Sequence, residues 1–260
     1  EWIAQSFARF KQGFAALGVM SLAPLTEREA AAYATGERVW YQTRSFGLTV
    51  LTDTTERAPT FSLVPFENTL SPTDPASLCY LSVPQAKDVA SAWQQLLGRA
   101  PRCLEWQECC AFTGLAWLQG YRIAHKPQAG ERVVAIETCA DGFRFSDGCE
   151  SVVFSGLFDG TPDPAERILF LNVLLKCLLN AHSTLVMGRL GRYEGNLMSY
   201  VKASNRKLID RAIRYVRILA AREGGVAPSY EDTAYALFAT LAELQPNQPV
   251  VLKTLDRLSK

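Results

Sequence analysis

A lysine near the start of a late helical pattern is a candidate for anion chemistry. Lys207 follows Ser204 by three residues, and Ser204 is a favourable N-cap for the helix expected at 204–222. The ammonium of Lys207 would add to the positive end of the helix dipole, so the two together would attract an anion. The alternative is a solvated cationic face, since the same helix also carries Arg206, Arg211, Arg214 and Arg217.

The chain has few cysteine and histidine side chains that could bind a metal or act in catalysis. The seven cysteines include no C-x-x-C pair, and we expect reduced thiols in a cytoplasmic protein. Zinc binding by Cys109, Cys110 and His125 is an alternative, but adjacent ligands suit a tetrahedral site poorly. His182 and Ser183 are helical neighbours that point in different directions, so they do not form a catalytic dyad. We therefore expect neither a metal nor a cofactor.

The first 36 residues predict two helices that pack on a larger body. A stripe with helical spacing is formed by Ile3, Phe7, Phe10, Phe14 and Leu17. Thr26 and Glu29 then form a capping-box signature, which predicts a short helix that starts there and stops at Gly36.

Short apolar or β-branched runs alternate with helical or turn-rich segments in the middle of the chain. The runs cover residues 38–42, 60–64, 78–83, 102–105 and 132–137, and a helix is expected at 85–97. This alternation predicts an α/β fold: a doubly wound, mostly parallel sheet flanked by helices.

After about Asp163 the strand pattern ends. Helices are predicted at 164–190, 204–222, 230–244 and 249–258. We therefore expect N-terminal helices over 1–36, an α/β domain over 37–200 and a C-terminal helical, lid-like module over 201–260.

Composition and charge exclude several classes of partner. Lys and Arg number 27 against 26 Asp and Glu, so no global field favours nucleic acid or an anionic membrane. The longest apolar stretch, Ile168 to Leu179, contains Asn172 and Lys176 and is too short to span a bilayer. We expect a cytoplasmic protein that binds neither nucleic acid nor membrane and captures any anion locally.

Two segments resemble a known family. Residues 180–211 contain N-x-x-S-T, then G-R-x-x-G-N-L-M, then S-N-R-K-L, and residues 53–61 read D-T-T-E-R-A-P-T-F. This pattern resembles the N-acetylmuramic acid 6-phosphate etherases and the related glucokinase regulatory protein, which belong to the sugar-isomerase-type (SIS) α/β proteins. The resemblance covers residues 37–245, with a weak middle, and it implies a three-layer SIS fold that binds a sugar phosphate.

The resemblance also implies roles for individual residues. Glu56 stands at the position of the acid-base glutamate of the etherases, and its carboxylate would serve an ether oxygen or accept hydrogen bonds from sugar hydroxyls. Ser204, Asn205 and Lys207 match the segment that holds the sugar phosphate, and Ser45 is a further expected contact. The alternative for Glu56 is a surface residue in a turn.

The sequence departs from the family at the phosphate loops. The loop at 43–47 has one glycine and a bulky Phe46, and the loop at 83–85 contains Pro84, which lacks an amide donor. We find no counterpart of the second catalytic glutamate. These departures favour the degenerate second SIS half of the glucokinase regulatory protein over a working etherase.

Three hypotheses follow. In the first, the chain is a non-catalytic, regulatory half that shares a sugar-phosphate site with a second SIS domain, either in the same polypeptide or in a homodimer. In the second, the parent protein is an etherase that cleaves the lactyl ether of N-acetylmuramic acid 6-phosphate, with Glu56 as acid-base. In the third, the chain is an interaction module that binds a protein such as a sugar kinase and no ligand of its own.

Overall fold

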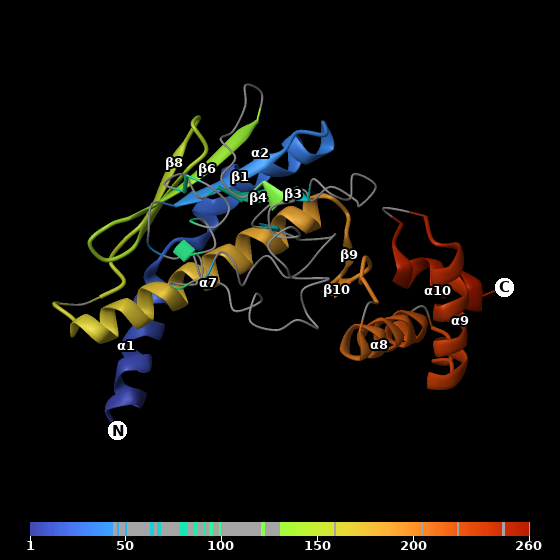
Figure 1. Cartoon of the computed structure of the whole chain (residues 1–260). Helices are drawn as coiled ribbons and strands as arrows, with labels where there is room; N and C mark the ends of the chain where they lie inside the picture. Colours follow the sequence, from blue (N-terminus) through green and yellow to red (C-terminus); the bar gives the residue numbers. More distant parts are fainter. Residues whose placement is uncertain are drawn as a thin grey trace. The chain divides into compact units, whose positions relative to one another are not determined.

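The chain forms two compact units, Glu1–Val186 and Met187–Lys260, which we call unit 1 and unit 2 and describe separately (Figure 1). The computed structural model describes residues 1–43, 46, 50, 63–64, 67–68, 79–82, 86–87, 91, 94–95, 99, 121–122, 131–158, 160–203, 205–222, 224–245 and 248–259. The three-part division expected from the sequence stays a prediction.

A six-stranded mixed sheet forms the body of unit 1, in the order β2-β4-β1-β6-β7-β8. Strands β2, β4, β1 and β6 run parallel, whereas β7 and β8 are added antiparallel at one edge. Their bounds are β1 Val39–Thr43, β2 Leu63–Val64, β4 Cys79–Ser82, β6 Arg132–Thr138, β7 Phe143–Ser146 and β8 Ser151–Phe154. A separate antiparallel pair joins β3 (Glu67–Asn68) to β5 (Tyr121–Arg122).

Strand β1 lies inside the sheet because its side chains are apolar or aromatic on both faces. Val39, Trp40 and Tyr41 are all buried, as expected for a strand covered on both sides. Val39 is in register with Cys79 of β4 on one side and with Arg132 of β6 on the other. The carboxyl end of β1 therefore lies in the parallel part of the sheet, where ligand-binding loops of α/β proteins are usually found.

Three α-helices of unit 1 are described: α1 (Trp2–Ala16), α2 (Ala23–Ala34) and α7 (Pro164–Arg189). A 3-10 turn, η1 (Val19–Leu22), precedes α2. The last turn of α7 belongs to unit 2. Helix α1 packs through aromatic contacts, with the Phe10 and Phe170 rings stacked at 5.0 Å. At the start of the chain, Trp2, Ile3 and Phe7 remain largely exposed.

Helix α7 is long and apolar enough, by length and composition alone, to cross a membrane. This differs from the expectation drawn from residues 168–179, because the helix extends beyond that stretch at both ends. In unit 1, Leu171, Leu174, Leu175 and Leu178 are fully buried, which is the pattern of a core helix.

Unit 2 contains a short hairpin and three helices. The hairpin pairs β9 (Tyr193–Glu194) with β10 (Leu197–Met198), and the helices are α8 (Arg206–Arg222), α9 (Tyr230–Glu243) and α10 (Val250–Leu258). Their shared core is formed by Leu197, Val201, Ala212, Ile213, Val216, Leu219, Leu237, Val250, Val251 and Leu255. The amphipathic pattern of the late helices therefore buries one face of each.

The structure confirms the α/β class, the sheet flanked by helices and the helical C-terminal part. Three local predictions are wrong. Thr26 and Glu29 do not cap a helix, since α2 already begins at Ala23 and both residues are buried within it. The β7–β8 hairpin was not predicted, and the β9–β10 hairpin interrupts the segment beyond Asp163 that was expected to be helical. The strand expected at 102–105 lies outside the described residues.

Candidate functional site

The first turn of α8 is capped by Asn205. The Asn205 side-chain oxygen accepts a hydrogen bond from the Leu208 amide at 3.1 Å, and its carbonyl accepts from the Leu208 and Ile209 amides at 3.0 and 2.9 Å. These are the contacts of an N-cap residue. The cap therefore lies one residue after Ser204, the position expected from the sequence, and Ser204 itself lies outside the described residues.

Lys207 is exposed on the same turn. In the described part of the chain it forms no ion pair, because Asp210, the acidic residue of the next turn, is already engaged. Arg214 donates to Asp210 at 2.8 Å, and the Tyr230 hydroxyl donates to the other carboxylate oxygen at 3.0 Å. The Lys207 ammonium is thus free to act with the positive end of the α8 dipole on an external anion.

Of the residues predicted to bind the sugar phosphate, the structure brings Asn205 and Lys207 together on one helical turn. Glu56, Ser45 and Ser204 lie outside the described residues, as do Cys109, Cys110 and His125 of the alternative zinc site. Within the described ranges, no group of three or more His, Cys, Asp or Glu residues is arranged to hold a metal ion.

The segment that leads from α7 into α8 is shaped by its glycines. A Cβ added to Gly188 would lie 2.0 Å from the Tyr193 hydroxyl oxygen, so only glycine permits this close approach. Gly195 has a φ of 59° at the two-residue turn between β9 and β10, where a primed hairpin turn requires positive φ. Asn196, beside it, accepts a hydrogen bond from Arg222 at 3.2 Å. Gly188, Gly195 and Asn196 therefore shape the chain segment between α7 and α8.

The loop after β1 has a described contact that bears on phosphate binding. The Thr43 hydroxyl donates to the Phe46 carbonyl at 2.7 Å, and the Phe46 ring lies 5.6 Å from the ring of Phe143. Phe143 is 1% exposed, so Phe46 packs against the core of unit 1. An aromatic side chain at this position serves packing, whereas a phosphate cradle needs small residues and close backbone amides.

A buried polar cluster joins α2, β1 and α7 in unit 1. The Glu29 carboxylate accepts hydrogen bonds from Tyr33 at 2.5 Å and from Tyr41 at 2.6 Å, and it lies 2.6 Å from Nε2 of His182. The other ring nitrogen of His182 lies 3.1 Å from the Thr26 hydroxyl. All five side chains are buried, so the cluster satisfies its polar groups internally.

Thr26 and Glu29 both make further contacts beside His182. The Thr26 hydroxyl donates to the Leu22 carbonyl at 3.0 Å, which uses its one hydrogen atom. Both ring nitrogens of His182 therefore face polar partners, Thr26 at Nδ1 and Glu29 at Nε2. Burial raises the pKa of Glu29, but the charge of His182 and the three donated hydrogen bonds outweigh it and hold that pKa below its ordinary value of 4.5.

Thr26, His182 and Glu29 follow one another as a hydroxyl, an imidazole and a carboxylate would in a catalytic triad. The Thr26 hydroxyl is buried and already donates to the Leu22 carbonyl, so it is not placed to attack a substrate. Burial raises the pKa of Cys79, which lies near Glu29, and this keeps the thiol protonated. The cluster is therefore an internal support.

Sequence reasoning missed this cluster. His182 was considered only beside Ser183, whose hydroxyl in fact donates to the Asn180 carbonyl at 3.3 Å. The available signal was an ionisable residue within an apolar helix, since such a side chain needs a buried partner. Its partner Glu29 is 153 positions away in the chain.

Comparison with known proteins gives one local likeness. No protein-family model matches the chain. The N-acetylmuramic acid 6-phosphate etherase of Synechococcus sp. strain CC9902 is 52% identical over 54 residues, which is 20% of this chain and 17% of that protein. The etherase of Synechococcus sp. strain CC9605 is 52% identical over 48 residues, 18% of this chain and 15% of that protein. The chain thus shares a segment with these etherases that spans about a sixth of their length.

Proposed function

We propose that the chain is an SIS-type domain that binds a sugar phosphate, with the phosphate at the first turn of α8. It acts as the regulatory, non-catalytic half of a tandem or paired protein. The single observation that carries the proposal is the 52% identity to proteins named for a sugar 6-phosphate substrate. The exposed Lys207 beside the Asn205 cap supports it, because an ammonium at a helix N-terminus is suited to a phosphate dianion.

Packing in unit 1 supports the non-catalytic part of the proposal. Phe46 contacts Phe143 in the core, so the loop after β1 offers an aromatic ring at a place where a phosphate loop needs close amide groups. A phosphate site without its own loop of backbone amides needs hydrogen-bond donors from another domain or subunit. We propose that a second SIS domain supplies them, in the same polypeptide or in a homodimer, and that Glu56 and Ser45 contact the sugar.

The binding proposal is tested by thermal unfolding of the full chain with glucose 6-phosphate, N-acetylglucosamine 6-phosphate and N-acetylmuramic acid 6-phosphate. A ligand present at about 100 times its Kd should stabilise the chain by about 2.7 kcal/mol. The Lys207→Ala variant should lose this stabilisation, whereas Lys11→Ala, which removes an exposed lysine from α1, should retain it. No stabilisation by any of the three compounds at millimolar concentration would contradict the proposal. It would favour the alternative that the chain is an interaction module, which binds a protein and no ligand of its own.

Catalysis by the parent protein is the second candidate, and the etherase names of the two matching proteins favour it. It is tested by measuring lactate release from N-acetylmuramic acid 6-phosphate with this chain and with any longer parent. An etherase should lose turnover in Glu56→Gln and keep its substrate affinity. A regulatory half should release no lactate in either form, and Glu56→Gln should weaken its binding.

A further inference from the structure

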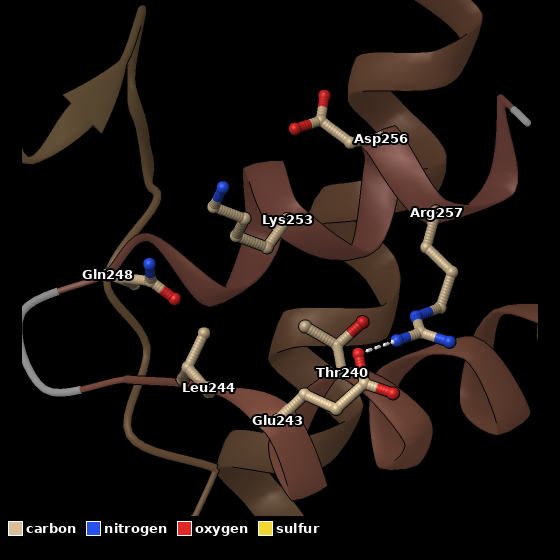
Figure 2. A pocket seen from close by; sticks show the side chains of 7 residues that line it. All are labelled: Thr240, Glu243, Leu244, Gln248, Lys253, Asp256 and Arg257. Atoms are coloured by element: carbon tan, nitrogen blue, oxygen red, sulfur yellow. Dashed lines mark hydrogen bonds and ion pairs between the residues drawn. The ribbon is translucent and has the colours of Figure 1, made fainter.

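A cleft opens between the end of α9 and the outer face of α10 in unit 2 (Figure 2). Its volume is about 630 Å³, which is enough for a phosphorylated monosaccharide. The loop between the two helices contributes Gln248, and Leu244 adds an apolar contact. The cleft lies within one unit, so its walls are fixed by the same core that holds the three helices together.

A buried hydroxyl in the wall of this cleft has no partner among the described residues. Thr240 is 5% exposed, and its hydroxyl forms no hydrogen bond within the described part of the chain. The other two buried threonines of unit 2 behave differently: Thr233 donates to the Ser229 carbonyl and Thr254 to the Val250 carbonyl, both at 2.7 Å. Figure 2 shows the Thr240 side chain directed from α9 toward α10. A ligand group that reaches this enclosed hydroxyl would provide the missing partner.

The charges around the cleft are of both signs. Glu243 and Arg257 neutralise each other in an ion pair across the two helices (Figure 2). Lys253 and Asp256 remain exposed, and neither is ion-paired within the described parts of the chain. They are three residues apart on α10 and therefore neighbours on its surface. The cleft thus presents one ammonium and one carboxylate that are available to a ligand.

We propose that this cleft binds a small hydroxylated zwitterion, whose anionic group contacts Lys253 and whose ammonium contacts Asp256. The two ligand charges lie several bonds apart, since the two side chains occupy successive turns of α10. The Gln248 side-chain oxygen already accepts from the Gln245 amide at 3.1 Å, which leaves its NH2 group to donate to a ligand hydroxyl. The Thr240 hydroxyl can donate and accept. A phosphorylated hexosamine has this chemistry. The site is separate from the proposed phosphate site at α8.

The test uses glucosamine 6-phosphate and glucose 6-phosphate. The first carries an ammonium at the carbon where the second carries a hydroxyl group. Both are titrated at pH 6.5 into the full chain carrying Lys207→Ala, so that the α8 site does not contribute, and the backbone amides are followed by NMR. Glucosamine 6-phosphate should shift the amide signals of residues 253–257. Glucose 6-phosphate should bind at least about tenfold more weakly, because it leaves Asp256 without a cation.

Variants separate the site from general stability. Lys253→Ala and Asp256→Asn should each weaken glucosamine 6-phosphate binding by at least about tenfold. Thr240→Val should weaken binding without lowering the melting temperature, since it removes a hydroxyl that has no partner. The matched variant Thr254→Val should lower the melting temperature and leave the affinity of the folded chain unchanged. Equal affinity for the two sugars, or no shift at residues 253–257, would overturn the proposal whatever the outcome at Lys207.

Discussion

The imidazole Nε2 of His182 lies 2.6 Å from the Glu29 carboxylate inside unit 1, and both side chains are at most 5% exposed. This contact connects α2 with α7, and the Tyr41 hydroxyl adds β1 to the same carboxylate. A buried ion pair is costly to desolvate, and removing one partner leaves the other charge uncompensated.

Glu29→Gln is expected to destabilise the chain by about 3 kcal/mol, because it removes the charged partner of the buried His182 side chain and of two tyrosine hydroxyls. Equilibrium unfolding in urea, followed by circular dichroism, measures this change. Tyr33→Phe removes one hydrogen bond to the same carboxylate and should cost less, about 2 kcal/mol. A double-mutant cycle with His182→Gln isolates the pair interaction, and a coupling energy near zero would refute the ion pair.

Acid should destabilise the wild-type chain through Glu29. Its pKa in the folded state lies below the ordinary value of 4.5, despite burial, because of the His182 charge and three hydrogen bonds. The stabilisation is therefore complete above pH 4.5 and is lost as the pH falls through the folded-state pKa. Unfolding free energies measured between pH 7 and pH 3 should decline more steeply for the wild type than for Glu29→Gln.

The comparison with Glu29→Gln is needed because Asp147 also makes the folded chain less stable as the pH falls. Burial raises the pKa of Asp147, but hydrogen bonds from Arg28 and from the amides of Glu150 and Cys149 hold it below its ordinary value. Asp147 is unchanged in the variant, so its contribution cancels in the difference. Parallel pH profiles for the two proteins would show that folding does not lower the pKa of Glu29.

Gly13→Ala should destabilise the packing of α1. An added Cβ would lie 2.1 Å from the carbonyl oxygen of Leu157, a backbone atom that cannot easily move. Alanine normally favours a helix over glycine, so a net loss of about 1–3 kcal/mol would show that the close approach dominates. Gly18→Ala is the matched control, since nothing lies within 4 Å of the added atom. Thermal unfolding of the two variants should therefore differ clearly.

Asn205→Ala should destabilise unit 2 by about 1 kcal/mol through loss of the α8 cap. Asn205→Asp keeps a cap oxygen and should retain stability, as measured by chemical denaturation. The added carboxylate should nevertheless weaken sugar-phosphate binding, because it places a negative charge at the anion site. Unchanged sugar-phosphate affinity in Asn205→Asp would show that the phosphate does not bind at the first turn of α8.

The sequence predicted elements best where a local pattern was long or fully apolar. The strand at 132–137 and the helices at 164–190 and 230–244 match β6, α7 and α9 to within one residue at every end. The β7–β8 hairpin was missed because its strands have four residues each and lie beside Gly142 and Gly148, whose neighbourhood is typical of turns. The capping-box signature at Thr26 failed because tertiary burial of both residues outweighed a local preference.

The candidate phosphate site could be placed in part from the sequence. The pattern S-N-R-K-L located the start of α8 to within two residues, because capping is a local property of the chain. That Lys207 has no acidic partner among the residues the structure describes could not be predicted, since it depends on Arg214 and Tyr230 both engaging Asp210. The cleft with Thr240 and Lys253 also depends on how α9 and α10 pack.

Periodicity and turn chemistry alone determined the α/β class, the helical C-terminal part and the start of α8, because these properties are set by residues close together in the chain. Tertiary structure decided which buried charges are paired. Glu29 and His182 are 153 positions apart, and no local pattern connects them. Their pairing follows from the packing of α2, β1 and α7, because a buried carboxylate must find its donors wherever the fold brings them.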